Sequence, residues 1–167
     1  MTFPSHIAVG YILAEGFLKA HLIPPNLVPY VYGVSIVSAN FPDMDAVLFK
    51  KIYDHRTNSP FHYPFTWWLI YLTVFVSIVI ANLQSLLPFV YLSILTLVSH
   101  FLMDTFGVNA GIRWFAPFHK KEYSFLRMEK RPDDVREWVL RYVKHPIMIV
   151  EVLLCLSGIL LYFFRGV

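Results

Sequence analysis

The chain has 167 residues, of which 57% are hydrophobic and 15% are charged, and its formal net charge is +3. This composition is far from that of an average soluble domain and indicates an integral membrane protein. The single cysteine, Cys155, excludes a disulfide framework and a thiolate metal site. We therefore expect residues 1–167 to form a single all-α membrane domain.

Five apolar segments alternate with polar connections, and we expect each segment to be a transmembrane helix. The expected spans are residues 7–23, 27–41, 63–81, 86–103 and 146–164. The last three carry almost no charge and have about the length that crosses a hydrocarbon core. The first two segments match a membrane span less well, because one contains charged residues and the other is short.

The charges predict how these spans are oriented. Five spans place the N-terminus and the two long connections, 42–62 and 104–145, on one side of the membrane. Twelve of the 14 Lys and Arg residues then fall on that side, and only Lys19 and Arg165 fall on the other. The positive-inside rule makes the basic side cytoplasmic. The basic excess thus reflects topology, and we expect no direct contact with nucleic acid.

The 104–145 connection is also expected to contain an amphipathic helix. Pro132, Asp133 and Asp134 are typical helix-opening residues, and apolar residues follow them at helical spacing. Such a helix would lie on the inner leaflet with its basic side chains near lipid phosphates. An ordinary packed helix fits the pattern equally well.

Histidines and acids gather where the expected spans begin or end on the cytoplasmic side. Because odd spans leave that side and even spans return to it, these residues reach one membrane depth. They are His6, Asp43, Asp45, His55, His62, His100 and Asp104. His100 and Asp104 also share one helical face, since four residues make about one turn. Intramembrane polar residues of this kind usually face a protein interior and have a function there.

This mixture of imidazoles and carboxylates suits Zn²⁺, or Mn²⁺ or Mg²⁺ if the carboxylates dominate. We expect five of the residues to be metal ligands: His6, Asp45, His62, His100 and Asp104. Asp43 would be a bridging ligand or general base, and His55 a ligand or proton carrier. The set exceeds one tetrahedral shell, so one or two ions are expected.

Other polar residues are candidates for supporting roles. Arg56 and the Lys50–Lys51 pair would neutralise an anionic group such as phosphate, or would serve only as topology determinants. Glu151 lies about 8 Å into the last span, where it would partner a ligand histidine or supply an extra ligand. Glu15 is expected to be paired within the bundle or solvated, and His119 remains a further candidate ligand.

Four short motifs in order resemble a known family. They are "PSHIAVG", "NFPDMDAV", "DHRTNSPFHY" and "SHFLMDTFGV…WFAPF", and they cover about two-thirds of the chain. This pattern resembles the LexA-binding, inner-membrane-associated metal-dependent hydrolases. One departure is that His55 and His62 are farther apart here than the equivalent pair in that family, and His62 is the stronger ligand candidate. The order of ligands is also similar to that of zinc-dependent phospholipase C, as an analogy only.

The resemblance and the residues together lead to a functional hypothesis. We expect a metal-dependent hydrolase of the inner membrane, acting on a phosphate ester or similar bond in a lipid-like amphiphile. Two alternatives stay open. One is a non-catalytic membrane anchor that binds a cytoplasmic regulator through the 104–145 segment, as the name of the family suggests. The other is a metal transporter or sensor that uses the same ligands.

Overall fold

The computed structural model describes residues 2–44, 59–108, 111–126 and 135–165. Within these ranges the regular secondary structure is helical, and the one β-type pairing is an isolated bridge between Ile112 and Tyr123. The expectation of an all-α protein is therefore confirmed for the described residues.

Six α-helices and four short 3₁₀ helices make up the described fold. The α-helices are α1 (Phe3–Lys19), α2 (Val31–Asn40), α5 (Pro64–Ile80), α6 (Leu87–Thr105), α7 (Val135–Val143) and α8 (Ile147–Phe163). The 3₁₀ helices are η1 (Pro25–Tyr30), η2 (Phe41–Asp43), η3 (Pro60–His62) and η4 (Gln84–Leu86). Prolines in the first two positions open α1, α5 and α6, where a missing amide hydrogen costs nothing.

The expectation of five transmembrane helices is not supported by the helix lengths. Among the described residues, the segment Gln84–Thr105 is long and apolar enough to cross a membrane. A second crossing exists if α7 and α8, which are bent by 75° at their junction, count as one span. The expected span 27–41 is shortened because its first residues belong to η1, whose Pro25 and Pro29 lack the amide hydrogen that an α-helix uses.

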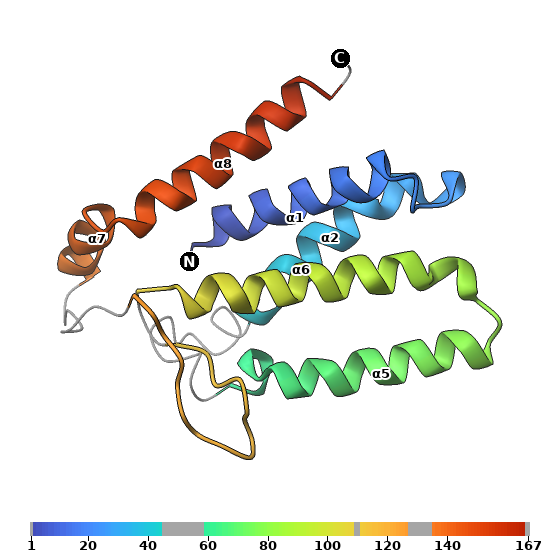
Figure 1. The fold of residues 1–167 in the computed structure, drawn as a ribbon, viewed down its shortest axis with the longest axis horizontal. Helices are drawn as coiled ribbons and strands as arrows, with labels where there is room; N and C mark the ends of the chain where they lie inside the picture. The colour runs from blue at the N-terminus through green and yellow to red at the C-terminus, as the bar shows by residue number, and fades with distance from the viewer. Residues whose placement is uncertain (1, 45–58, 109–110, 127–134, 166–167) are drawn as a thin grey trace.

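Figure 1 shows how the helices are arranged. The α5–α6 pair forms an antiparallel hairpin, and α1 packs against α2, α6 and α8. The contact between α1 and α2 is close at Gly10, whose carbonyl accepts a 2.6 Å hydrogen bond from the Ser35 hydroxyl. A Cβ atom at Gly10 would lie 3.1 Å from the Ala39 Cβ and 3.2 Å from the Ser35 carbonyl oxygen. Small residues therefore set the spacing between these two helices.

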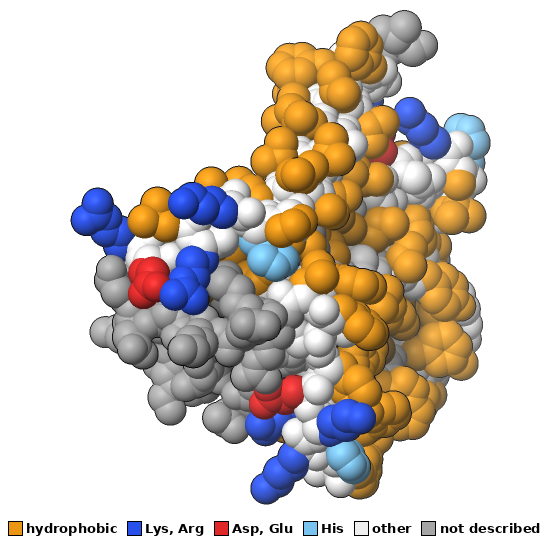
Figure 2. Space-filling model, turned by 60° about the vertical axis from the view of Figure 1, so that its left-hand side comes forward, with side chains coloured by type: hydrophobic (Ala, Val, Ile, Leu, Met, Phe, Trp, Pro, Cys, Tyr) orange, Lys and Arg blue, Asp and Glu red, His pale blue; other side chains and the backbone are white. Residues whose placement is uncertain are grey.

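Hydrophobic side chains cover the upper and right-hand parts of the face seen in Figure 2. Large hydrophobic side chains point outward along α5 and α8, among them Trp68, Ile80, Ile149 and Phe163, which are 59%, 75%, 65% and 73% exposed. Contiguous apolar surface of this kind is typical of a membrane or protein contact. The interior of the bundle, by contrast, contains several buried polar side chains, and some of them form the candidate site.

Candidate metal centre

Four chain segments begin or end at the same end of the bundle (Figure 1), and each carries a polar side chain of one cluster there. His6 lies near the start of α1, Asp43 ends η2, and His62 ends η3. His100 and Asp104 lie in the last turns of α6. The side chains of the three histidines and of Asp104 are completely buried, whereas the Asp43 side chain is 15% exposed.

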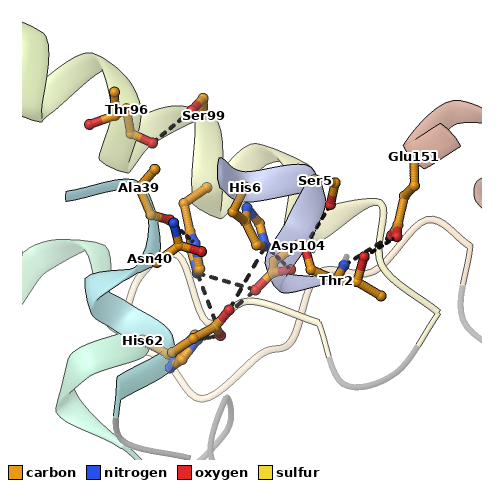
Figure 3. A network of polar contacts seen from close by, with 12 residues as sticks. Thr2, Ser5, His6, Ala39, Asn40, His62, Thr96, Ser99, Asp104 and Glu151 are labelled. Atoms are coloured by element: carbon orange, nitrogen blue, oxygen red, sulfur yellow. Dashed lines mark hydrogen bonds and ion pairs between the residues drawn. The ribbon is translucent and has the colours of Figure 1, made fainter. Parts of the chain in front are cut away.

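The nitrogen atoms of these histidines face the oxygen atoms of the two aspartates. His62 Nε2 lies 3.3 Å from Asp43 Oδ1 and 4.0 Å from Asp104 Oδ2. His100 Nε2 lies 3.4 Å from Asp104 Oδ2 and 3.9 Å from Asp43 Oδ1. His6 Nε2 lies 3.4 Å from Asp104 Oδ1 and 4.0 Å from Asp43 Oδ2. The side chains of His6, His62 and Asp104 point toward one another in Figure 3.

Packing and one backbone hydrogen bond orient two of the histidine rings. His100 Nδ1 lies 2.7 Å from the carbonyl oxygen of Ala39, so the ring donates there and keeps Nε2 for the centre. The His6 ring stacks on the His100 ring with centroids 4.1 Å apart. Within the described part of the chain, His100 Nε2 and both ring nitrogens of His6 are buried and make no hydrogen bond.

These separations suit ligands that surround one cation. Two atoms bound ~2.1 Å from an ion lie ~3.4 Å apart at a tetrahedral angle and ~4.2 Å apart on opposite sides of it. One ligand atom from each of Asp43, His62, His100 and Asp104 lies within 4.8 Å of the other three. Imidazole nitrogens and carboxylate oxygens are also the donors that Zn²⁺ and similar ions prefer. The four residues could therefore hold a metal ion, with His6 beside them.

The structure thus brings together five residues that the sequence singled out. Asp43, expected as a bridging ligand or base, lies 3.3 Å from His62 and 3.9–4.0 Å from His100 and His6, so it also belongs to the cluster. Asp45, His55, Arg56 and the Lys50–Lys51 pair lie outside the described residues, so their roles stay predictions. His119 lies away from the centre: its side chain is exposed, and its Nδ1 accepts a 3.0 Å hydrogen bond from the amide of Lys121.

Glu151 and Glu15 are both buried. Glu151 makes a different contact from the one expected, whereas Glu15 is paired within the bundle, which is one of its two expected environments. Glu151 hydrogen-bonds to Thr2 and Tyr142 rather than to a ligand histidine. Glu15 lies toward the opposite end of α1, where its carboxylate accepts hydrogen bonds from Tyr11 at 2.9 Å and Tyr32 at 2.6 Å. Its Oε1 atom also lies 3.3 Å from Nε of Arg165.

Sequence reasoning missed the backbone and small polar groups around the centre. The Ala39 carbonyl cannot be recognised from a side-chain pattern at all. Thr2 and Ser5, whose side chains lie beside His6 in Figure 3, gave only a weak signal, since serine and threonine are common at helix starts. The structure shows that Thr2 hydrogen-bonds to Glu151 on α8 and that Ser5 hydrogen-bonds to the carbonyl of Thr2.

An apolar helical bundle with buried imidazoles and carboxylates at one end is the arrangement of a membrane protein with a polar functional centre. A family model supports this class: the chain belongs to the YdjM inner membrane protein family, whose model matches residues 1–167. No curated protein matches the chain, and no solved structure does. The expected inner-membrane location is thereby supported, whereas LexA binding and hydrolysis stay predictions.

Proposed function

We propose that this protein is a multi-pass, metal-dependent hydrolase of the inner membrane. The observation that carries the proposal is the buried cluster in which three imidazoles and two carboxylates face one another at 3.3–4.0 Å. Burying polar groups is costly unless they are paired or bound to a metal, so such a cluster requires a function or a partner. A divalent cation held there would supply Lewis acidity for hydrolysis of an ester.

The residues of the centre would have different roles in binding and catalysis. His62, His100 and Asp104 hold the ion, with His6 as a further ligand. Asp43 completes the set and acts as bridging ligand or general base, because its carboxylate is the partly exposed member of the cluster. If Asp45 and His55 add donors, the centre holds two ions instead of one. Zn²⁺ is the first candidate, followed by Mn²⁺ and Mg²⁺.

An amphiphile is the proposed substrate because apolar surface lies beside the exposed member of the cluster. Phe41 and Met44, on either side of Asp43 in the chain, are 41% and 43% exposed. A lipid-like molecule could therefore contact these side chains while its polar group reaches the carboxylate. A phosphate ester is the proposed bond, since Arg56 and the two lysines before it would suit an anionic headgroup.

The positions of the basic residues and the exposed apolar side chains support the proposed arrangement of the protein in the membrane. Helices α5 and α8 have 17 residues each, so they rise ~25 Å, near the lower limit for a membrane span. Their exposed apolar side chains would face lipid. The basic connections at the His and Asp end favour a cytoplasmic location for the centre by the positive-inside rule.

The proposal is tested by metal content. Detergent-purified protein is measured by plasma mass spectrometry beside the His100→Ala/Asp104→Ala double variant, with size-exclusion chromatography to confirm that both are folded. We expect one or two equivalents of a transition metal in the wild type and none in the double variant. A wild type that stays empty after incubation with Zn²⁺ or Mn²⁺ would contradict the proposal.

Activity is the second part of the test. The metal-loaded protein is assayed against soluble phosphodiesters and against phospholipid vesicles, with and without a chelator. Hydrolysis that is lost in the double variant and on chelation supports an enzyme. Metal binding without any turnover would instead favour one of the alternatives, a metal sensor or transporter, and partner binding without metal would favour a membrane anchor for a cytoplasmic regulator.

A further inference from the structure

Glu151 connects the last helix to the start of the first. It lies one turn into α8 and is only 3% exposed. Its carboxylate accepts a 3.0 Å hydrogen bond from the amide of Thr2 and further hydrogen bonds from the hydroxyls of Thr2 and Tyr142. Figure 3 shows Glu151 and Thr2 side by side, next to Ser5 and His6. The carboxylate therefore holds the residue that immediately precedes α1.

Thr2 also makes hydrogen bonds with the start of α1, the part of the helix that contains His6. The Thr2 carbonyl accepts hydrogen bonds from the amides of Ser5 at 3.1 Å and His6 at 3.3 Å, and from the Ser5 hydroxyl at 2.7 Å. The amide and hydroxyl of Thr2 are thus bound by Glu151, and its carbonyl is bound by the helical turn that contains His6. The negative carboxylate is also favourable near the positive end of the α1 dipole.

A second contact keeps α8 in place against α1. Gly158 lies seven residues, about two turns, after Glu151, so both residues are on the same face of α8. A Cβ atom at Gly158 would lie 3.4 Å from the Cβ of Ala8 on α1. Contacts at two levels, Glu151 with Thr2 and Gly158 with Ala8, determine where α1 lies along α8.

The two buried histidines that stack on each other differ in how their rings are held. The Ala39 carbonyl orients the His100 ring through Nδ1. The His6 ring makes no such bond within the described residues, since neither of its nitrogens has a hydrogen-bond partner there. Its Nε2 approaches Asp104 Oδ1 at 3.4 Å and the ring stacks on His100, but no backbone group among the described residues orients the ring. The position of the ring therefore depends strongly on the position of the His6 backbone, which is anchored through Thr2.

We infer that Glu151 is a positioning residue that places His6 in the metal centre by anchoring the start of α1. Tyr142, on α7, donates a hydrogen bond to the same carboxylate and helps to orient it. This inference rests on the proposed function, because it assumes that the centre binds a metal. It assigns Glu151 a role through Thr2 rather than the direct contact with a ligand that its sequence position suggested.

The experiment compares Glu151→Ala with a matched variant, Glu15→Ala. Glu15 is also a buried carboxylate that accepts hydrogen bonds from two tyrosines, but it lies nine residues farther along α1 than His6. Zn²⁺ affinity is measured by competition with a chromophoric chelator in detergent, after size-exclusion chromatography and a thermal melt of each variant. We expect Glu151→Ala to weaken binding on the order of 10- to 100-fold, as loss of a group that supports a ligand does, and Glu15→Ala to leave it nearly unchanged.

Three further measurements separate positioning from general destabilisation. In Glu151→Gln, the remaining side-chain oxygen can still accept from the Thr2 amide, so we expect part of the affinity to return. In a His6→Ala background, Glu151→Ala should cause no additional loss, because its effect passes through His6. The visible spectrum of Co²⁺ bound to Glu151→Ala should likewise match that of His6→Ala rather than the wild type.

The outcomes distinguish this inference from the proposal on which it rests. Equal losses from Glu151→Ala with and without His6, or an unchanged affinity, would overturn the positioning role while leaving the metal centre intact. The same loss in Glu15→Ala would also overturn it, since both variants would then act through stability. A wild-type protein that binds neither Zn²⁺ nor Co²⁺ would remove the proposed function and this inference together.

Discussion

The carbonyl oxygen of Ala39 lies 2.7 Å from Nδ1 of His100, and this hydrogen bond joins the end of α2 to the end of α6. It fixes the His100 ring so that Nε2 faces Asp43 and Asp104. A histidine that binds metal commonly donates its other ring N–H to a carbonyl or carboxylate in this way. The bond also connects the spacing of α1 and α2, set at Gly10, to the geometry of the centre.

Histidines inside and outside the cluster should differ in their effect on metal binding. His62→Ala removes a completely buried nitrogen 3.3 Å from Asp43, so we expect metal content to fall by at least half in purified protein. His119→Ala is the matched control, because His119 is exposed and bonds only to the nearby Lys121 amide in the described structure. Plasma mass spectrometry measures both. Equal metal content in the two variants would argue against the assigned ligands.

Metal removal should lower the thermal stability of the protein. A ligand that binds only the folded state at 1,000 times its Kd stabilises that state by about 4 kcal/mol. We therefore expect a chelator to lower the melting temperature of the wild type in detergent by several degrees. The His100→Ala/Asp104→Ala variant should melt at the same temperature with and without chelator. A chelator effect of equal size in the variant would mean that the metal binds elsewhere.

Two glycines of α1 should respond in opposite directions to alanine. Gly10→Ala places a Cβ 3.1 Å from the Ala39 Cβ and close to the α2 backbone, so the helices must separate and the melting temperature should fall. Gly16→Ala meets no atom within 4 Å, and alanine is favoured over glycine in a helix by about 1 kcal/mol, so stability should rise. Gly10→Ala should also weaken Zn²⁺ binding, since α2 carries the Ala39 carbonyl. Unchanged stability in Gly10→Ala would show that α2 adjusts freely.

Labelling of single cysteines tests the proposed membrane orientation. In a Cys155→Ala background, Gln84→Cys places a thiol at the exposed turn between α5 and α6, and Lys120→Cys places one in the exposed segment after α6. A reagent that does not cross membranes should label the first variant in cells with an open outer membrane. It should label the second only after the inner membrane is permeabilised. The reverse result would place the metal centre on the outer side.

Much of the candidate site could be predicted from the sequence, because polar residues in apolar segments are rare and their positions along a helix give their depth. His6, Asp43, His62, His100 and Asp104 were recognised in this way, and the structure places all five at one end of the bundle. The membrane spans were predicted less well. Segment 27–41 is apolar, but prolines divide it into η1 and the short helix α2, which an apolar pattern alone does not reveal.

The contacts of Glu151 show where sequence reasoning ends. Its depth in the last helix suggested a ligand histidine as its partner, whereas α8 turns it toward Thr2 and Tyr142. The rotation of a helix about its axis depends on which small residues meet its neighbour, here Gly158 against Ala8. Nothing in the spacing of residues along one helix specifies that partner.

The amino-acid sequence is enough to identify an apolar, all-helical chain of the inner-membrane type, with imidazoles and carboxylates at the ends of its helices. Hydropathy and helical periodicity are properties of single segments, so they can be seen without knowing how the segments pack. The packed fold is needed to see that histidine nitrogens and aspartate oxygens from four segments face one another at 3.3–4.0 Å. Distances across helices depend on close packing of small side chains and on backbone groups such as the Ala39 carbonyl, which no local pattern encodes.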